Sequence, residues 1–241
     1  GPGVMVCILF ACFIGMATKF AEVMLSMCYR EVDASGKIFG GPFQYIKKGL
    51  TDIGLPVAGK ILAVVFAIFC LGGALGGGNM FQSNQTVKVM TTTFPALAPY
   101  GWAIALAFAL LVFCVMVGSI KSIARVAEKI SPLKGILYLI CAVIIVGANI
   151  DKLSGTLALI MQDAFTGNAA AGGLIAMLAM AFKRASFANE AGLGSAPIAH
   201  ATARTKEPAR EAAVALLEPF FAAMIALLTG LIVTITVAYA G

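Results

Sequence analysis

Long apolar segments, separated by more polar connections, restrict what this sequence can fold into. A helix needs about 20 mostly apolar residues to cross the hydrocarbon core of a membrane, and lipid satisfies no backbone polar group outside a helix or a closed barrel. The candidate spans are residues 2–28, 61–87, 101–120, 134–150, 172–200 and 212–240. The sequence therefore predicts an all-α integral membrane protein of about six transmembrane helices, forming a single transmembrane domain over residues 1–241.

The composition agrees with burial in lipid and argues against an ordinary soluble domain. Apolar residues make up 61% of the chain and charged residues only 12%, whereas about 25% of a soluble domain is charged. The net charge of +6 would suggest nucleic acid in a soluble protein, but here we expect membrane lipid as the surroundings and no nucleic acid. The cysteines form no Cys-x-x-Cys pair, and we interpret them as small buried apolar residues rather than disulfides or metal ligands.

Basic residues are concentrated in alternate connections between the predicted helices. Most lie in residues 30–60, 121–134 and 201–211, whereas the second and fourth connections contain only Lys88 and Lys152. Lysines and arginines near the ends of transmembrane helices stay on the cytoplasmic side. We therefore expect a multi-pass protein of the cell membrane, with the loops 30–60, 121–134 and 201–211 in the cytoplasm.

A polar stripe follows the glycine-rich middle of the second predicted helix. Asn79, Gln82, Ser83 and Thr86 come directly after the glycines of 72–78, at spacings that place them on one helix face. Polar residues at membrane depth are costly and usually serve a partner or a pathway. Asn79 and Gln82 are therefore candidates for binding a small zwitterion. The alternative is hydrogen bonding to a neighbouring helix, or simply the wet end of this helix.

A second polar stretch interrupts the fifth predicted helix, 172–200. Two basic residues, Lys183 and Arg184, are followed by Gly192, Gly194 and a proline, which is unfavourable for a regular helix facing lipid. Transporters use such broken helices near the bilayer midplane, where unwound backbone offers carbonyls to a cation and N–H groups to a carboxylate. The alternative is a helix that ends early at the cytoplasmic face, with the glycines as stop signals.

At this stretch the sequence resembles a known family. Residues 186–201, SFANEAGLGSAPIAHA, resemble the signature of the alanine/glycine:cation symporters, the sodium:alanine symporters. Further stretches resemble that family in the same order along the chain: GMATKFAE at 15–22, GGPFQYIKKGL at 40–50 and GNMFQSN at 78–84. Residues 221–223 are Phe-Ala-Ala where the family pattern has Ile-Asp-Thr, which indicates a divergent member or a fragment.

The resemblance implies an architecture, a partial five-plus-five inverted-repeat bundle like that of the bacterial leucine transporter. By that resemblance the chain covers repeat helices two to seven. It lacks the first broken helix, which in such folds carries half of the substrate and cation sites. The second broken helix, 172–200, is then the half of the site that this chain holds. The chain also begins inside an apolar run, and we expect it to be a fragment.

The resemblance further implies secondary active symport of a small neutral amino acid, alanine or glycine, with sodium or a proton across the cytoplasmic membrane. Neither catalysis nor a cofactor is expected, nor any metal beyond a sodium ion, and the sequence has no Gly-x-Ser-x-Gly or His-Glu-x-x-His motif. A channel or pore module that uses the polar stripe as a filter is the alternative, and the sequence allows a monomer. The expected substrate-binding residues are Asn79, Gln82, Phe187, Asn189, Ala191 and Gly192. The expected cation-binding residues are Ser186, Asn189 and Glu190.

Isolated charges within the predicted spans also have structural interpretations. Lys19 and Glu22, three residues apart on one helix, are expected to form an ion pair rather than a proton relay. Glu190 either binds a cation or holds the broken helix in shape, and we favour the structural role because a carboxylate can satisfy freed backbone N–H groups. His200 is expected at the cytoplasmic edge. Glu218 either faces the bundle interior or caps a kink, and the sequence does not decide between these.

Overall fold

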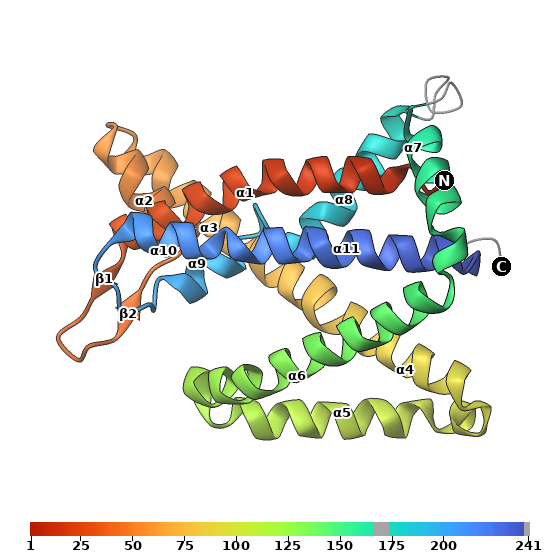
Figure 1. The fold of residues 1–241 in the computed structure, drawn as a ribbon. Helices are drawn as coiled ribbons and strands as arrows, with labels where there is room; N and C mark the ends of the chain where they lie inside the picture. Colours follow the sequence, from red (N-terminus) through yellow and green to blue (C-terminus); the bar gives the residue numbers. More distant parts are fainter. Residues whose placement is uncertain (166–173, 239–241) are drawn as a thin grey trace. The chain divides into compact units, whose positions relative to one another are not determined.

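The computed structural model describes residues 1–165 and 174–238, and these are almost entirely helical (Figure 1). The all-α membrane class predicted from the sequence is confirmed. Among the described residues, β structure is limited to one short antiparallel hairpin of β1 (Glu31–Val32) and β2 (Ile38–Phe39). Contacts divide the chain into two compact units, which we describe separately: unit 1 is Gly1–Cys70 with Ile144–Gly241, and unit 2 is Leu71–Val143.

Unit 1 is organised around one long helix, α1 (Val4–Tyr29). The other helical elements that lie in it wholly or in part are α2 (Pro42–Asp52), α3 (Pro56–Gly73), η3 (Ile150–Lys152), α7 (Leu153–Phe165), α8 (Leu174–Asn189), α9 (Ser195–His200), α10 (Pro208–Ala215) and α11 (Leu217–Ile235). Helices α8, α10 and α11 make the most extensive contacts with α1, and α9, α2 and α7 also touch it. The elements before and after residue 189 therefore pack against the same helix.

Buried apolar side chains, several of them alanines, form two clusters that hold these helices against α1. Small residues let helix backbones approach closely in a membrane, where tight packing rather than exclusion of water drives helix association. The first cluster contains Ala11, Cys12, Ala185 and Ala223. The second cluster contains Val23, Met27, Ala212 and Ala215. The first joins α1 to α8 and α11, and the second joins it to α10.

Unit 2 begins inside a continuous helical segment. Helix α3 passes directly into a π-helical turn, η1 (Ala74–Met80), and then into α4 (Phe81–Thr93). The 3-10 helix η2 (Pro95–Tyr100) leads into α5 (Gly101–Met116), which packs against α4. Helix α6 (Ser119–Ala148) follows and continues into unit 1.

Five helical segments of the described chain are long and apolar enough to cross a membrane. They are Val4–Tyr29, Pro56–Thr93, Pro95–Met116, Ser122–Ala148 and Pro208–Ile235. The predicted span 172–200 is absent from this set, because α8 ends at Asn189 and α9 begins only at Ser195. Its first two residues lie outside the described part of the chain.

The predicted loop 121–134 is wrong. Helix α6 runs without interruption from Ser119 to Ala148, so these residues are helical and the fourth predicted span begins earlier than residue 134. The proline at position 132 suggested a break, but it lies inside the helix. Helices of membrane proteins tolerate proline, because neighbouring groups and water satisfy the carbonyl that it frees. The basic residues of this segment therefore lie on a helix rather than on an irregular connection.

Candidate functional site

The most irregular backbone of unit 1 lies between α8 and α9. Glu190, Gly192 and Gly194 have positive φ angles of 52°, 87° and 82°. Residues with a Cβ adopt this conformation only at a cost, whereas glycine does so freely. Residues 190–194, which we call the break, thus cannot continue α8. The break lies where the sequence pattern of glycines and charges predicts it.

Local hydrogen bonds define the shape of the break. The side-chain oxygen of Asn189 accepts a 3.0 Å hydrogen bond from the backbone N–H of Ala191. The N–H of Leu193 donates to the carbonyl of Glu190 at 3.1 Å, and the hydroxyl of Ser195 donates to the Glu190 carboxylate. An Asn side chain that bonds the backbone two residues ahead is a turn-forming arrangement. The Glu190 carboxylate thus contacts a side-chain hydroxyl across the break, not the freed backbone N–H groups on which the sequence analysis based its structural role.

Helix α1 supplies a buried positive charge at the end of α8. The ammonium of Lys19, which is fully buried, donates a 2.7 Å hydrogen bond to the carbonyl of Asn189. The same nitrogen lies 3.0 Å from the carboxylate of Glu218 on α11. The sequence predicted an ion pair of Lys19 with Glu22. That prediction is wrong, because Lys19 forms its salt bridge with Glu218. The partner lies on another helix, and the packing of α1 against α11 brings it within reach.

Glu22, one turn further along α1, faces the break. Its carboxylate lies under the electrostatic influence of the backbone amide of Gly192 and of Lys19. One of its two oxygens is buried and has no hydrogen-bond partner among the described residues. Gly15, one turn before Lys19, lies so close to Asn189 that an added Cβ would come within 2.5 Å of its side-chain nitrogen. The GMATKFAE segment of α1 therefore packs on the last residue of α8, and Glu22 at its end lies beside the break.

A second set of contacts joins α1 to the segment after the break. The hydroxyl of Ser26 donates to the carbonyl of Pro197 at 2.6 Å and accepts a 2.9 Å hydrogen bond from the N–H of Gly41. The guanidinium of Arg30 donates to three backbone carbonyls beyond α9. These are Ala201 at 3.0 Å, Ala203 at 2.7 Å and Thr205 at 2.6 Å. His200 lies with its Nδ1 2.6 Å from the Glu211 carboxylate. Three of the four stretches that resemble the symporter family thus meet in unit 1.

Charged groups in the predicted cytoplasmic segment 30–60 fasten the β-hairpin to α2. Lys48 lies 2.6 Å from the carboxylate of Glu31 and also donates to the carbonyl of Tyr29 at 3.1 Å. The hydrogen bond from Lys48, with a further one from Gln44, holds the pKa of Glu31 below its usual value. Burial, with the nearby charge of Glu22, raises the pKa of Tyr45 on α2 to about 12. These contacts hold the β-hairpin and the end of α1 against α2 without being part of the break.

The predicted binding residues divide between the two units. Those at 186–192 lie together at the end of α8 and in the break, where Ser186, Phe187 and Glu190 are exposed and Asn189 is buried. Asn79 and Gln82 belong to unit 2, where each is exposed. The side-chain nitrogen of Asn79 donates to the carbonyl of Ala74 at 3.1 Å, across the π-helical turn.

The π-helical turn is a feature that the sequence analysis missed. A π turn, in which each N–H bonds the carbonyl five residues back, is rare inside an α-helix and often marks a functional site. Added Cβ atoms at Gly72, Gly73, Gly76 and Gly78 would meet nothing within 4 Å among the described residues. Within unit 2, these four glycines therefore have open space beside them. The signal available in the sequence was the density of glycine just before Asn79.

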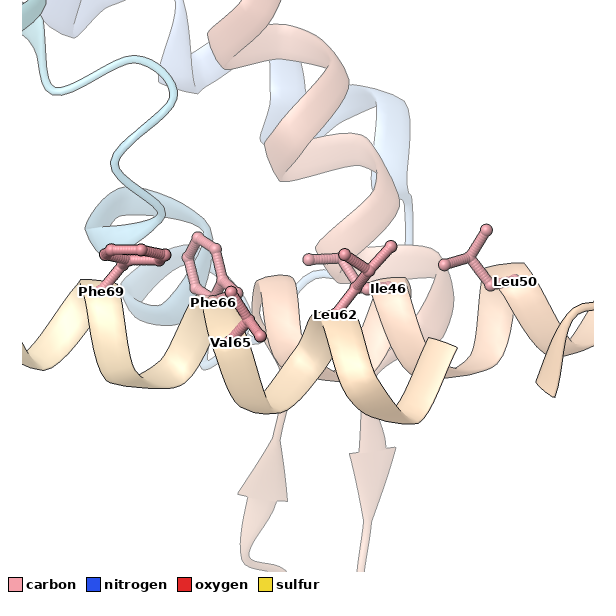
Figure 2. Close-up of a pocket in the computed structure, with 6 residues that line it drawn as sticks. All are labelled: Ile46, Leu50, Leu62, Val65, Phe66 and Phe69. Carbon is pink, nitrogen blue, oxygen red and sulfur yellow. The ribbon is translucent and has the colours of Figure 1, made fainter. Parts of the chain in front are cut away.

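An apolar pocket lies between α2 and α3 (Figure 2), and one of its lining rings, that of Phe66, also lies against Gly194 of the break. Figure 2 shows side chains of both helices directed toward it. Its lining residues are Ile46, Leu50, Leu62, Val65, Phe66 and Phe69. A zwitterion needs charged or polar partners when it is removed from water. This pocket supplies only hydrocarbon, so it is unsuitable for an amino acid.

An apolar helical bundle with one glycine-rich, charged break inside it is typical of a membrane transporter. The chain belongs to the sodium:alanine symporter family, whose family model matches residues 1–241. It is a multi-pass membrane protein by its helices and its family.

Curated relatives match nearly the whole chain. The chain is 39% identical over 240 residues to the sodium/alanine symporter AgcS of Methanococcus maripaludis, covering 98% of this chain and 51% of that protein. It is 34% identical to the probable sodium/glutamine symporter GlnT of Bacillus subtilis, covering 88% of this chain and 42% of GlnT. It is 31% identical to the putative sodium/proton-dependent alanine carrier protein YrbD of the same organism, covering 89% and 42%. The chain spans about half the length of the curated relatives it matches.

Proposed function

We propose that this chain takes part in sodium-coupled symport of a small neutral amino acid, alanine or glycine, across the cell membrane. The observation that carries the proposal is the break at 190–194, which interrupts a helix in an otherwise apolar bundle. Irregular backbone at membrane depth is tolerated where it is buried in protein or lines a cavity, and transporters use it to bind substrates and ions. The names of the relatives AgcS and YrbD, which mention sodium and alanine, support the choice of ion and substrate.

The carboxyl end of α8 is the proposed cation site. The last carbonyls of a helix carry partial negative charge, which favours a cation nearby. Ser186 and Glu190 are exposed at this end and have oxygen-bearing side chains. Both oxygens of Asn189 already accept hydrogen bonds, from Lys19 and Ala191. We therefore assign sodium first to Ser186 and Glu190, with Asn189 shaping the site.

The neighbouring residues are the proposed contacts of the amino acid. A Cβ added at Gly192 would meet no described atom within 4 Å, so there is space beside this backbone for a small ligand. Ala191 precedes it, and Phe187 offers an exposed apolar surface at the end of α8. For unit 2 by itself, we propose from their chemistry alone that the exposed amides of Asn79 and Gln82 can hydrogen-bond an amino acid.

Uptake into proteoliposomes tests this function. The protein, expressed from its full coding sequence, is reconstituted, and uptake of radiolabelled alanine is measured under an inward sodium gradient. We expect saturable uptake that stops when sodium is replaced by choline, with competition from glycine and weaker competition from leucine. Saturable uptake that depends on a pH gradient and not on sodium would show that the coupling ion is a proton. Flux that neither saturates nor depends on a gradient would contradict symport and favour a pore.

A further inference from the structure

Lys19 is the most completely buried charge in the described part of the molecule. Its side chain is inaccessible to solvent, and its ammonium contacts the carbonyl of Asn189 and the carboxylate of Glu218. A buried ammonium is tolerated only when such partners replace its water. The two partners come from different helices, so one nitrogen of α1 joins the end of α8 to α11.

The contact with Asn189 lies at the last residue of α8. The carbonyls of a final helical turn have no partner within the helix, and a cation beside them is favoured by the helix dipole. The carbonyl that Lys19 binds is the one after which the backbone turns to a positive φ at Glu190. The ammonium therefore lies at the point where the helix ends and the break begins.

We propose that Lys19 is a positioning residue of transport: it fixes the end of α8 against α11 and so sets the place and shape of the break. This inference rests on the proposed function, because the break is the proposed site for substrate and sodium. Lys19 itself contacts neither of them. It acts through Asn189, whose side chain in turn holds Ala191.

The two partners of the salt bridge, Lys19 and Glu218, differ in their exposure to solvent, and this difference distinguishes a positioning role of Lys19 from that of a simple ion pair. Lys19 is fully buried, whereas the side chain of Glu218 is 44% exposed. Loss of Lys19 leaves the Asn189 carbonyl without its partner. Loss of the Glu218 charge leaves Lys19 bonded to that carbonyl. A positioning role therefore predicts that Lys19→Met is far more damaging to the site than Glu218→Gln.

The test compares four variants by a readout of the break that needs no transport. A single cysteine replaces Leu193, which is 49% exposed in the break, in a background without the native cysteines. Its rate of maleimide labelling is measured in Lys19→Met, Lys19→Arg, Glu218→Gln and the double variant Lys19→Met/Glu218→Gln. Lys48→Met, which removes a different salt-bridging lysine near the same helix, is the matched control. Michaelis constants and maximal rates of alanine uptake are measured in parallel.

We expect Lys19→Met to change the labelling rate and to raise the Michaelis constant about tenfold or more, the size of a lost hydrogen bond to a charged group. Lys19→Arg, which keeps the charge and a donor, should restore part of both. The double variant should stay defective, because it still lacks the donor to Asn189. If Lys19→Met does not fold, Lys19→Arg and Glu218→Gln decide: the larger guanidinium shifts the donor at Asn189, whereas Glu218→Gln leaves Lys19 in place, so Lys19→Arg should be the more defective of the two.

Two results would overturn the proposal. One is a labelling rate and Michaelis constant in Lys19→Met equal to those of Lys48→Met. The other is full recovery in the double variant, which would reduce Lys19 to the counter-ion of Glu218. If the unaltered protein shows no alanine uptake, the proposed function fails, but the labelling rates still report whether Lys19 positions the break.

Discussion

The hydroxyl of Ser26 on α1 donates a 2.6 Å hydrogen bond to the carbonyl of Pro197 in α9. The same oxygen accepts a 2.9 Å hydrogen bond from the backbone N–H of Gly41, just before α2. Ser26 is fully buried, so one hydroxyl satisfies two backbone groups that water does not reach. It joins three segments that are far apart in the sequence.

Ser26→Ala should therefore leave the buried N–H of Gly41 without its partner, whereas the Pro197 carbonyl keeps the hydrogen bond that it accepts from the N–H of Ala201. We expect the free energy of unfolding to fall by about 1–3 kcal/mol, the cost of an unsatisfied buried polar group. Thermal unfolding in detergent measures the loss. Thr51→Val is the control, because the hydroxyl of Thr51 is exposed and bonds only the carbonyl of Lys47 in its own helix. An equal loss in the control variant would contradict the role given to Ser26.

Arg30 binds the segment between α9 and α10 through three carbonyls. A guanidinium presents its donors in a planar fork, whereas a lysine has one compact ammonium on a flexible stem. We expect Arg30→Lys to lose at least one of these hydrogen bonds and about 2 kcal/mol of local stability. Hydrogen exchange of residues 201–207 should accelerate. Arg210→Lys, an exposed arginine on α10, is the control and should leave exchange of these residues unchanged.

Sequence patterns predicted the membrane class, the family and the position of the break, because each depends on local residue types. Length and apolarity decide whether a helix can span lipid. Glycine at 192 and 194 allows the left-handed backbone that ends α8. These signals need no knowledge of what packs against them.

Features that depend on packing were not predictable in this way. Sequence spacing favoured Glu22 as the partner of Lys19, yet α11 brings Glu218 to 3.0 Å from a residue remote in sequence. The continuity of α6 through Pro132 depends on how neighbouring groups satisfy the freed carbonyl, which no local pattern records. The π-helical turn that contains Asn79 is likewise one of two helical hydrogen-bond patterns that the same residues could adopt.

The salt bridge of Glu31 and Lys48 should make part of the stability depend on pH. The pKa of Glu31 is lowered, chiefly by Lys48, from its usual 4.5, so folding favours the ionised carboxylate. Its contribution is fully present well above pH 4.5 and is lost as the pH falls through the lowered pKa. We expect Lys48→Met to flatten the decline of melting temperature with acid. Lys60→Met, an exposed lysine at the start of α3, is the control.

Asp33 provides an internal check on this pH prediction. Its pKa is also lowered, first by the hydroxyl of Ser35 and then by the backbone N–H of Lys37, and neither contact involves Lys48. Part of the acid-dependent loss should therefore persist in Lys48→Met and disappear only when Asp33→Asn is added. A decline with acid that is identical in the unaltered protein and in Lys48→Met would remove the role given to this salt bridge.

The two glycines of the break separate a structural role from a functional one. Both have positive φ, so alanine at either position costs about 1–2 kcal/mol through the backbone alone. At Gly194 a Cβ would also overlap the ring of Phe66 and crowd Pro42, whereas at Gly192 it would meet nothing within 4 Å among the described residues. Gly194→Ala should therefore lower the melting temperature more than Gly192→Ala does.

The rate of alanine uptake should not follow the melting temperatures of Gly192→Ala and Gly194→Ala. If substrate occupies the space beside Gly192, a methyl group there removes uptake out of proportion to the modest loss of stability. Gly155→Ala in α7 is the control, because Gly155 is helical, lacks a positive φ and has no close neighbour, so alanine should keep or raise stability by up to about 1 kcal/mol. Uptake by Gly192→Ala at the unaltered rate, with the protein folded, would mean that the open space at Gly192 is not where the amino acid binds.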